Sequence, residues 1–563
     1  MSSARSCMQI IATLSKEEDE IKFDLLAGQV TLEMLRCLLL LSSSGQGVLY
    51  LTQPPLIRGC IRLMKTIKVD SHVSPFSYEY GYLCFNIAKM ALGCCLVEKF
   101  NKQHIAELME RIWANYQTKD NPSILTEQLS EIFLNETTKS SPREARCDWI
   151  FGWSDPPAHG GHPNLIVAES DALDLMNVLW NDRKAFLKSL SSTYTPGALI
   201  ILLLIWQYML RNGLQRDLPD PGLQTPLLGP FLDLSWRFAL VAMPADYALA
   251  YRTALITMFY LEELTESAVD MEDSRTIINA YIKSIPIIED TVLYRQVALG
   301  LYPHLPRFVV RNILPGTADL FPALIKTILG RMWEMALWQG VEHAMPPVAV
   351  IASGFDDLLL FLQVHVPRLP PQSSVMQLIL EELAGQDLLG LVGFTINRLD
   401  PTRASNPTMM HHDPTSCMQF KNLLLFMLVV LSQASSTCTI PSYFPDYETE
   451  WIKHLQYNDV LLQMAGNSES ARSCAEFRRE LLWDVIKRVG RGDEIKKRLR
   501  WFHLLSCDYE RCPVSSWVGY APLWCSSCIA SPGRANYCSS QCQVLDWSCE
   551  GQHSHRNSCP RSD

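Results

Sequence analysis

Residues 374–385 have the sequence SVMQLILEELAG, which is typical of the chain up to about residue 500. The apolar residues of this stretch recur three and four positions apart: Val375, Leu378, Ile379 and Leu383. This is the spacing of one face of an α-helix. Ser374 is a residue type favoured before a helix, and Gly385 is one favoured at its end. The stretch therefore predicts a short amphipathic helix.

The same spacing appears elsewhere along the chain. Five apolar residues follow it before Gly490: Phe477, Leu481, Leu482, Val485 and Ile486. Near the N-terminus, five more fit one side of a helix or of a broken helix pair: Ile21, Leu25, Leu32, Leu35 and Leu39. Because strict alternation of apolar and polar residues is scarce over the first 500 residues, we predict a mainly α fold.

No internal repeat of fixed length is found by eye. An irregular helical stack of the armadillo or HEAT kind tolerates the decay of its repeats and needs mostly apolar helix pairs. A single irregular α-helical domain fits the sequence as well. Both descriptions of the helical body stay open.

Composition limits the classes of protein that fit. The chain has 563 residues, of which 48% are apolar and 19% charged, with a net charge of −10 and a mean hydropathy of +0.03. This composition predicts a folded chain, and the excess of acidic residues argues against direct binding of nucleic acid. The longest apolar runs, Ala198–Ile205 and Leu423–Leu431, fall short of the roughly 20 residues that cross a bilayer. We therefore expect buried helices and no membrane contact.

The predicted regions are separated by composition. Residues 140–164 are rich in proline and glycine, which favours a connector between an N-terminal helical region, 1–139, and a main helical region, 165–500. A cysteine-rich tail, 501–563, follows. The first residues lack the pattern of a signal peptide, so we expect an intracellular protein, in the cytoplasm or the nucleus, with reduced thiols.

Eight of the 18 cysteines lie in the tail. From residue 507 its sequence is CDYERCPVSSWVGYAPLWCSSCIASPGRANYCSSQCQVLDWSCEGQHSHRNSC. Soft ligands occur there as four closely spaced pairs: Cys507 with Cys512, Cys525 with Cys528, Cys538 with Cys542, and His555 with Cys559. Four pairs suffice for two tetrahedral zinc ions, and such a small module needs metal to fold. With all positions filled by protein, the zinc would be structural rather than catalytic. Spacing alone also allows the pairs to combine in sequential order.

The segment Tyr537-Cys538-Ser539-Ser540-Gln541-Cys542, followed by Asp546-Trp547 and by His555-Arg556-x2-Cys559, resembles the MYND-type zinc finger. The resemblance covers about residues 507–559. It implies a cross-brace, in which the ligand pairs interleave. One zinc would take Cys507, Cys512, Cys538 and Cys542, and the other would take Cys525, Cys528, His555 and Cys559.

Two features depart from the family pattern. Four residues separate Cys507 from Cys512, where the family has two. The stretch before His555 is also longer than usual, and it contains two rival ligands, Cys549 and His553. The ending His-Arg-x-x-Cys favours His555 over His553 as the ligand.

The resemblance implies a protein-interaction module, because some MYND fingers bind short proline-containing peptides in a surface groove. Three tryptophans either line such a groove or complete the small core: Trp517, Trp524 and Trp547. We therefore predict a non-catalytic adaptor whose partners are proteins. A transcriptional or chromatin regulator and an enzyme with an unrecognised site in the helical body are the alternatives.

Two further segments allow more than one interpretation. The basic residues between Lys487 and Arg500 fit the solvated side of two helices, a nuclear import signal or a docking face for an acidic partner. Pro54-Pro55-Leu56-Ile57 fits a helix start, where proline costs no hydrogen bond, or a peptide that masks the finger of its own chain.

Overall fold

The computed structural model describes the chain in segments, and the structural statements below concern these segments alone. In the body they are 2–100, 102–115, 119–138, 148–154, 165–214, 226–246, 250, 253, 269–284, 305–337, 347–370, 373–399, 415–434, 443–444, 447–490 and 492–501. In the tail they are 507, 509, 523–525, 535–537, 539–548, 555 and 559.

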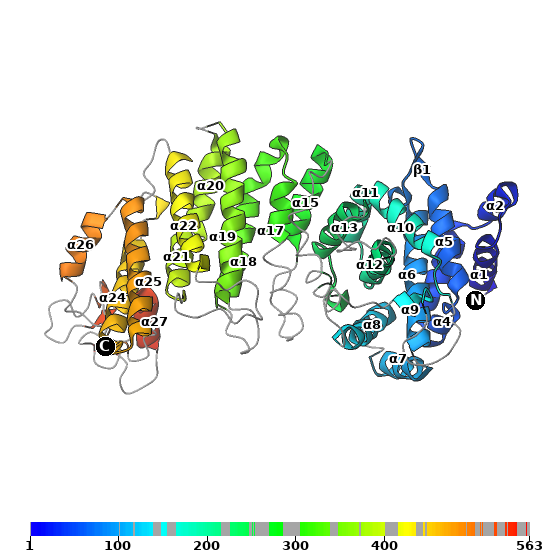
Figure 1. Cartoon of the computed structure of the whole chain (residues 1–563), viewed down its shortest axis with the longest axis horizontal. Coiled ribbons are helices and arrows are strands. Elements are labelled where there is room, and N and C mark those ends of the chain that lie inside the picture. Colours follow the sequence, from blue (N-terminus) through cyan, green and yellow to red (C-terminus); the bar gives the residue numbers. More distant parts are fainter. Residues whose placement is uncertain are drawn as a thin grey trace. The chain divides into compact units, whose positions relative to one another are not determined.

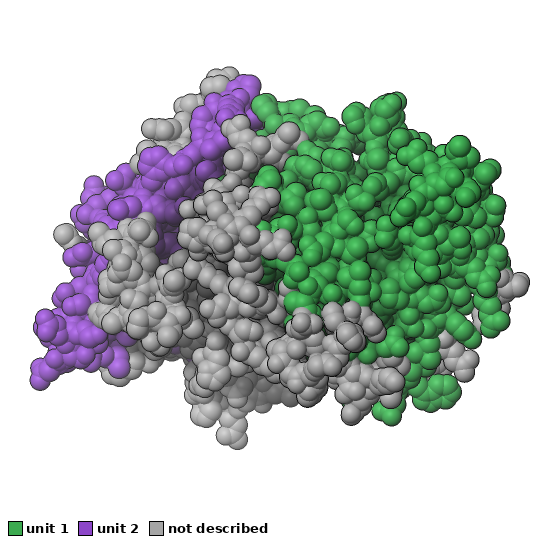
Figure 2. Space-filling view, turned by 45° about the vertical axis from the view of Figure 1, so that its right-hand side comes forward, with its two compact units in different colours: residues 1–317 green, residues 318–563 purple. Residues whose placement is uncertain are grey.

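The fold is mainly α, as predicted (Figure 1). The chain divides into two compact units, residues 1–317 and 318–563 (Figure 2). This division falls inside the predicted main helical region, and the predicted boundaries at 139, 164 and 500 stay predictions. The finer expectation of an armadillo- or HEAT-like stack also stays a prediction.

The first half of unit 1 contains α1 (Ser2–Leu14), α2 (Glu20–Ala27), α3 (Leu32–Leu39), η1 (Leu40–Ser43), α4 (Gly45–Tyr50), α5 (Pro54–Thr66), β1 (Lys68–Val69), β2 (His72–Val73), η2 (Pro75–Ser77) and α6 (Glu79–Phe100). Strands β1 and β2 form a small antiparallel hairpin. The longest helix, α6, packs along α5, and α3 also contacts it.

The second half of unit 1 contains α7 (Lys102–Asn115), α8 (Asn121–Thr138), α9 (Asp148–Phe151), α10 (Glu169–Asn181), α11 (Arg183–Ser192), α12 (Ala198–Leu214), α13 (Leu228–Ala239), η3 (Pro244–Asp246), α15 (Met271–Lys283) and α17 (Leu305–Arg311). Helix α9 lies inside the predicted connector, 140–164. The run Ala198–Ile205 forms the start of α12 and is largely buried, as expected.

Unit 2 begins within η5 (Pro315–Leu320). It contains α18 (Phe321–Leu337), α19 (Pro347–Val364), η6 (Val366–Arg368), α20 (Ser374–Gly385), α21 (Leu388–Ile396), α22 (Thr415–Ala434), α24 (Tyr447–Met464), α25 (Glu469–Val489), α26 (Gly492–Trp501), β3 (Leu523–Trp524), β4 (Asn536–Tyr537) and α27 (Ser540–Ser548). Helices α18 to α22 lie side by side, and α24 packs along α25 (Figure 1).

Local sequence rules explain several of the described helix ends, with one correction. Ser373, rather than the predicted Ser374, caps α20, because its Oγ accepts a hydrogen bond from the Met376 amide. Gly385 is the last residue of α20, so the helix ends where it was expected to end. Gly490 ends α25 in the left-handed conformation that glycine tolerates best.

The apolar residues near the N-terminus form the broken helix pair that the sequence allowed, α2 and α3. Leu35 is fully buried in α3, but the expectation of one shared buried side is wrong for α2. Ile21 is 75% exposed and Leu25 is 66% exposed, and Phe23 is the buried residue of that helix. Tertiary packing turned α2 so that its single aromatic side chain faces inward.

The proline-rich segment at Pro54 is the start of a helix. Pro54 and Pro55 occupy the first positions of α5, and Leu56 and Ile57 are 0% and 1% exposed. Apolar side chains buried in unit 1 cannot serve as a peptide that masks the finger. The helix-start interpretation is therefore confirmed.

One helix of the described chain, α6, is long and apolar enough to span a membrane by composition. A second candidate is the pair Glu20–Ala27 with Leu32–Ser43, which is bent by 72°. Of the apolar window in Glu79–Lys99, 89% is buried inside the protein, as in the central helix of a folded domain.

Candidate metal centre

A two-stranded hairpin and a short helix support the described part of the tail. Leu523 of β3 pairs with Tyr537 of β4, and Trp524 pairs with Asn536. Cys525 follows β3 directly, and its amide donates a hydrogen bond of 3.1 Å to the carbonyl of Ala535. The hairpin therefore holds the backbone of Cys525 in place.

Helix α27 places a second cysteine. Ser539 precedes this helix, and its Oγ accepts a hydrogen bond of 3.1 Å from the Cys542 amide. This is the geometry of a serine cap, which satisfies an amide that the first turn of a helix leaves without a partner. Cys542 is thereby fixed in the first turn of α27, where it is buried.

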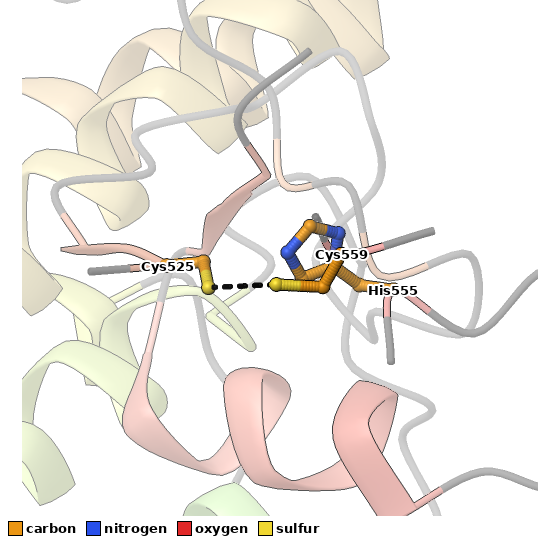
Figure 3. A group of neighbouring side chains, drawn as sticks. All are labelled: Cys525, His555 and Cys559. Carbon is orange, nitrogen blue, oxygen red and sulfur yellow. Dashed lines mark hydrogen bonds between the residues drawn. The ribbon is translucent and has the colours of Figure 1, made fainter. Parts of the chain in front are cut away.

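Three residues form the candidate metal centre: Cys525, His555 and Cys559. One ligand atom from each lies within 4.8 Å of the other two, and all three residues are buried. Figure 3 shows the two sulfur atoms facing each other, with the imidazole of His555 beside them. The described part of the tail thus holds one Cys2His site that could bind a metal.

The distance between the sulfur atoms indicates the chemistry of the site. Cys525 Sγ and Cys559 Sγ are 3.8 Å apart. A disulfide bond would bring them to about 2.05 Å. Two thiolates on one tetrahedral zinc, each at about 2.3 Å from the metal, lie about 3.8 Å apart. The two sulfur atoms are therefore spaced as ligands of a common ion.

Two aromatic side chains, the buried Tyr537 and the partly exposed Trp547, lie beside the imidazole of His555. Its ring lies edge to face with Tyr537, at 6.3 Å between centroids, and 6.1 Å from the ring of Trp547. Tyr537 Oη donates a hydrogen bond of 2.7 Å to Asp546 Oδ2, and both residues are buried. These contacts restrict the orientation of the imidazole, as the surroundings of metal-binding histidines usually do.

A second cluster lies in the same part of the tail. Cys542 packs with Ala535 and Tyr537, and the half-buried Cys507 and Tyr509 pack against this group. Cys507 and Cys542 are 35 positions apart in the chain, so folding brings the two ends of the predicted first zinc set toward one cluster. The other predicted ligands lie outside the described residues, as do both rivals: Cys512, Cys528, Cys538, Cys549 and His553.

The described ligands can be compared with the two orders of pairing. In sequential order, Cys525 would share an ion with Cys507 and Cys512. The structure instead brings Cys525 together with His555 and Cys559, about 30 positions further along the chain. These three residues belong to one set in the interleaved order, and that order, with His555 as the histidine ligand, stays a prediction.

The tryptophans of the tail are less informative. Trp547 is 38% exposed and also contacts His555, so it belongs partly to the core and partly to the surface. For Trp524 the structure describes only the backbone, and Trp517 lies outside the described residues.

The helical body contains buried ionisable groups that the sequence did not reveal. Burial lowers the pKa of Lys89 to about 8 and raises the pKa of Asp246 to about 7. Both groups have structural partners: Lys89 Nζ donates to Asn86, and Asp246 accepts hydrogen bonds from the amides at the start of α12. A single lysine or aspartate in an apolar stretch does not indicate whether its side chain is buried, so the sequence could not identify these two groups.

Comparisons with protein-family models, curated proteins and solved structures found no match for this chain.

Proposed function

We propose that the chain is a non-catalytic, intracellular adaptor that recruits proteins through a C-terminal MYND-type zinc finger and its helical body. One observation carries the proposal. Beside the candidate metal centre, α27 exposes apolar side chains: Val544 at 63%, Leu545 at 42% and Trp547 at 38%. A module this small has few apolar residues for its own core, so their exposure points to a surface that binds a partner.

The finger is proposed to contain two structural zinc ions. The first would bind Cys507, Cys512, Cys538 and Cys542, and the second Cys525, Cys528, His555 and Cys559. The spacing of the sulfur atoms of Cys525 and Cys559 supports the second site, and the packing of Cys507 near Cys542 supports the first. With four protein ligands on each ion, neither zinc would keep a position for water, so the metal would shape the finger without catalysing a reaction.

The exposed residues of α27 suggest how a partner would bind. Val544 and Trp547 are three positions apart and therefore share one face of the helix. Trp547 also contacts His555, so metal binding would fix the ring at the surface. An apolar peptide, with a proline against the tryptophan, fits a face of this kind.

Metal analysis of the purified full-length chain tests the zinc sites. We expect two zinc ions per chain, falling to one in Cys525→Ser and in Cys559→Ser, because each variant removes a thiolate from the second site alone. Cys37→Ser, which changes a half-buried cysteine in unit 1, should keep both ions. Equal zinc content in the wild type and in Cys525→Ser would contradict the proposed site.

Affinity capture tests the adaptor function. Val544→Asp changes an exposed residue, so this variant should keep its two zinc ions and still lose the partners that the finger recruits. Cys525→Ser should lose the same partners, because the second zinc no longer holds that part of the finger in place. If both variants recover the partners of the wild type, the finger has no part in recruitment. This result would contradict the proposed role of the finger.

A nuclear regulator is the second candidate, and exposed basic residues favour it. Lys487 and Arg488 at the end of α25, and Lys496 and Lys497 on α26, are all exposed. A fluorescent fusion that enters the nucleus, and leaves it when Lys496 and Lys497 become alanine, would support this function. An unchanged distribution would count against it.

A further inference from the structure

Helix α2 presents an apolar pair to solvent in unit 1. Ile21 and Leu25 are 75% and 66% exposed, and because they are four positions apart they lie next to each other on one face. Burial of two large aliphatic side chains against a partner is favourable. An exposed pair of this kind therefore points to a binding surface.

This face is held in a defined orientation. Asp19 caps the helix by accepting hydrogen bonds from the amides of Ile21 and Lys22. On the opposite side, the guanidinium of Arg62 lies 4.3 Å from the ring centroid of Phe23. Arg62 also donates hydrogen bonds to the carbonyls of Leu14 and Glu17. The helix is therefore attached through its inner side, and little ordering is needed before its outer side can bind.

Acidic side chains border the apolar pair. Glu20 and Asp24 form a second row along the helix, one position before Ile21 and Leu25, and both are exposed. Residues 16–27 contain five carboxylates and only two lysines. We refer to Glu20, Ile21, Asp24 and Leu25 as the acidic face. A partner for this surface needs an apolar contact bordered by positive charge.

Unit 2 carries a surface of that description. The half-buried Trp483 of α25 and the exposed Lys487 are four positions apart on one face. From α26, Lys496 Nζ lies 5.9 Å from the centroid of the Trp483 ring. Residues 483–500 contain seven lysines and arginines and three acidic residues. We refer to Trp483, Lys487 and Lys496 as the basic patch.

Asp484, which lies next to the basic patch, does not cancel the charge of Lys487. Asp484 lies 2.9 Å from Lys421 of α22, and its distance to Lys487 is 3.8 Å. Lys421 thus compensates the carboxylate, and the charge of Lys487 stays available at the surface.

We propose that the acidic face of one copy of the chain docks on the basic patch of a second copy. Ile21 and Leu25 would pack against Trp483, while Glu20 and Asp24 would face Lys487 and Lys496. Opposite charges at the border would align the contact and speed association, and the apolar centre would supply most of the affinity.

The two surfaces differ, so the contact joins copies head to tail. The dimer would still have one free basic patch, on the copy whose acidic face is bound, and one free acidic face, on the other copy. A head-to-tail contact therefore continues into longer chains unless it closes into a ring. This proposal is independent of the finger's function, because none of its residues belongs to the tail.

Analytical ultracentrifugation of the full-length chain, from low to high micromolar concentration, tests the proposal. The mass should rise with concentration, and the association should weaken as salt is added, because salt screens the charges at the border of the contact. Ile21→Asp with Leu25→Asp should weaken self-association at least about tenfold, and so should Lys487→Glu with Lys496→Glu. The control Leu337→Asp, which changes a leucine that is 63% exposed on α18, should leave association unchanged.

A mixture gives the decisive result. The two double variants each keep one intact surface, so each alone should be monomeric and an equimolar mixture should form dimers and nothing larger. Circular dichroism should show that both variants keep the helix content of the wild type. A wild-type chain that stays monomeric at every concentration, or a mixture that stays monomeric, would overturn the proposal.

Discussion

His454 of α24 accepts a hydrogen bond within the core of unit 2. Its Nδ1 lies 2.6 Å from Asn397 Nδ2, and Asn397 Oδ1 accepts a hydrogen bond of 2.7 Å from Asn458. Because Asn458 occupies the amide oxygen, Asn397 presents its NH2 group to the imidazole. Nδ1 is therefore unprotonated and accepts the hydrogen bond. Burial lowers the pKa of the His454 imidazole to about 4.

This pKa predicts a stability that depends on pH. Between pH 6.5 and pH 4 the unfolded chain binds a proton at His454 and the folded chain does not, so the stability falls as the pH falls. The contribution is complete above about pH 6.5 and amounts to up to roughly 3 kcal/mol. Urea unfolding at pH 7 and pH 4.5 should show that the wild type loses more stability than His454→Asn.

The neighbours of His454 and a matched variant complete that test. Glu450 and Lys453 on the same helix act on its pKa in opposite directions, and burial is the largest cause of the shift. The exposed His72 provides the control, since His72→Asn should keep the pH response of the wild type. Equal losses in the wild type and His454→Asn would contradict the predicted role.

At the scale of the element, two glycines that end helices differ in their backbone. Gly490 follows α25 with a φ of +96°, and its amide donates to the carbonyl of Ile486. Gly385 is the last residue of α20 and lies outside the positive-φ region. A Cβ atom would meet nothing within 4 Å at either position, so only the backbone conformation distinguishes them.

Alanine should therefore have opposite effects at these two positions. Gly490→Ala should destabilise unit 2 by about 1 kcal/mol, because alanine is strained in the left-handed region. Gly385→Ala should be neutral or stabilise by up to about 1 kcal/mol, because it restricts the unfolded chain without strain. Thermal unfolding followed by circular dichroism measures both, and the same sign for both variants would contradict the assignment of the cap.

At the scale of the whole molecule, unit 1 contains a buried ionic group that joins distant segments. Arg237 of α13 is 0% exposed, and its guanidinium forms hydrogen bonds of 2.6 and 2.8 Å with Asp273 of α15. Asp233, one turn earlier in α13, binds the same guanidinium. A buried charge needs its partners, and the loss of one costs about 3–5 kcal/mol.

Fragments of the chain should reflect this requirement. Residues 1–317 form one compact unit that includes both aspartates, so this fragment should fold alone and unfold cooperatively. Residues 1–268 lack Asp273 and leave Arg237 with one partner, so this fragment should be much less stable. Circular dichroism and urea unfolding of the two fragments test the prediction, and equal stabilities would contradict it.

The metal centre shows how far sequence reasoning reached. The pairs of cysteines could be identified because two thiols a few residues apart can bind one ion whatever the rest of the chain does. Whether Cys525 lies close to His555 and Cys559 depends on the fold of the roughly 30 residues between them. Spacing alone therefore left the order of pairing open, and only the family resemblance implied the interleaved one.

The helical class of this protein, its cap at Gly490 and its candidate ligands followed from the sequence, because each depends on residues within a few positions of one another. The outward direction of Ile21 and Leu25, the neutral imidazole of His454 and the partners of Arg237 followed only from the tertiary structure. These features depend on which distant helix packs against which face, and that choice is a balance over the whole core rather than a property of any local stretch.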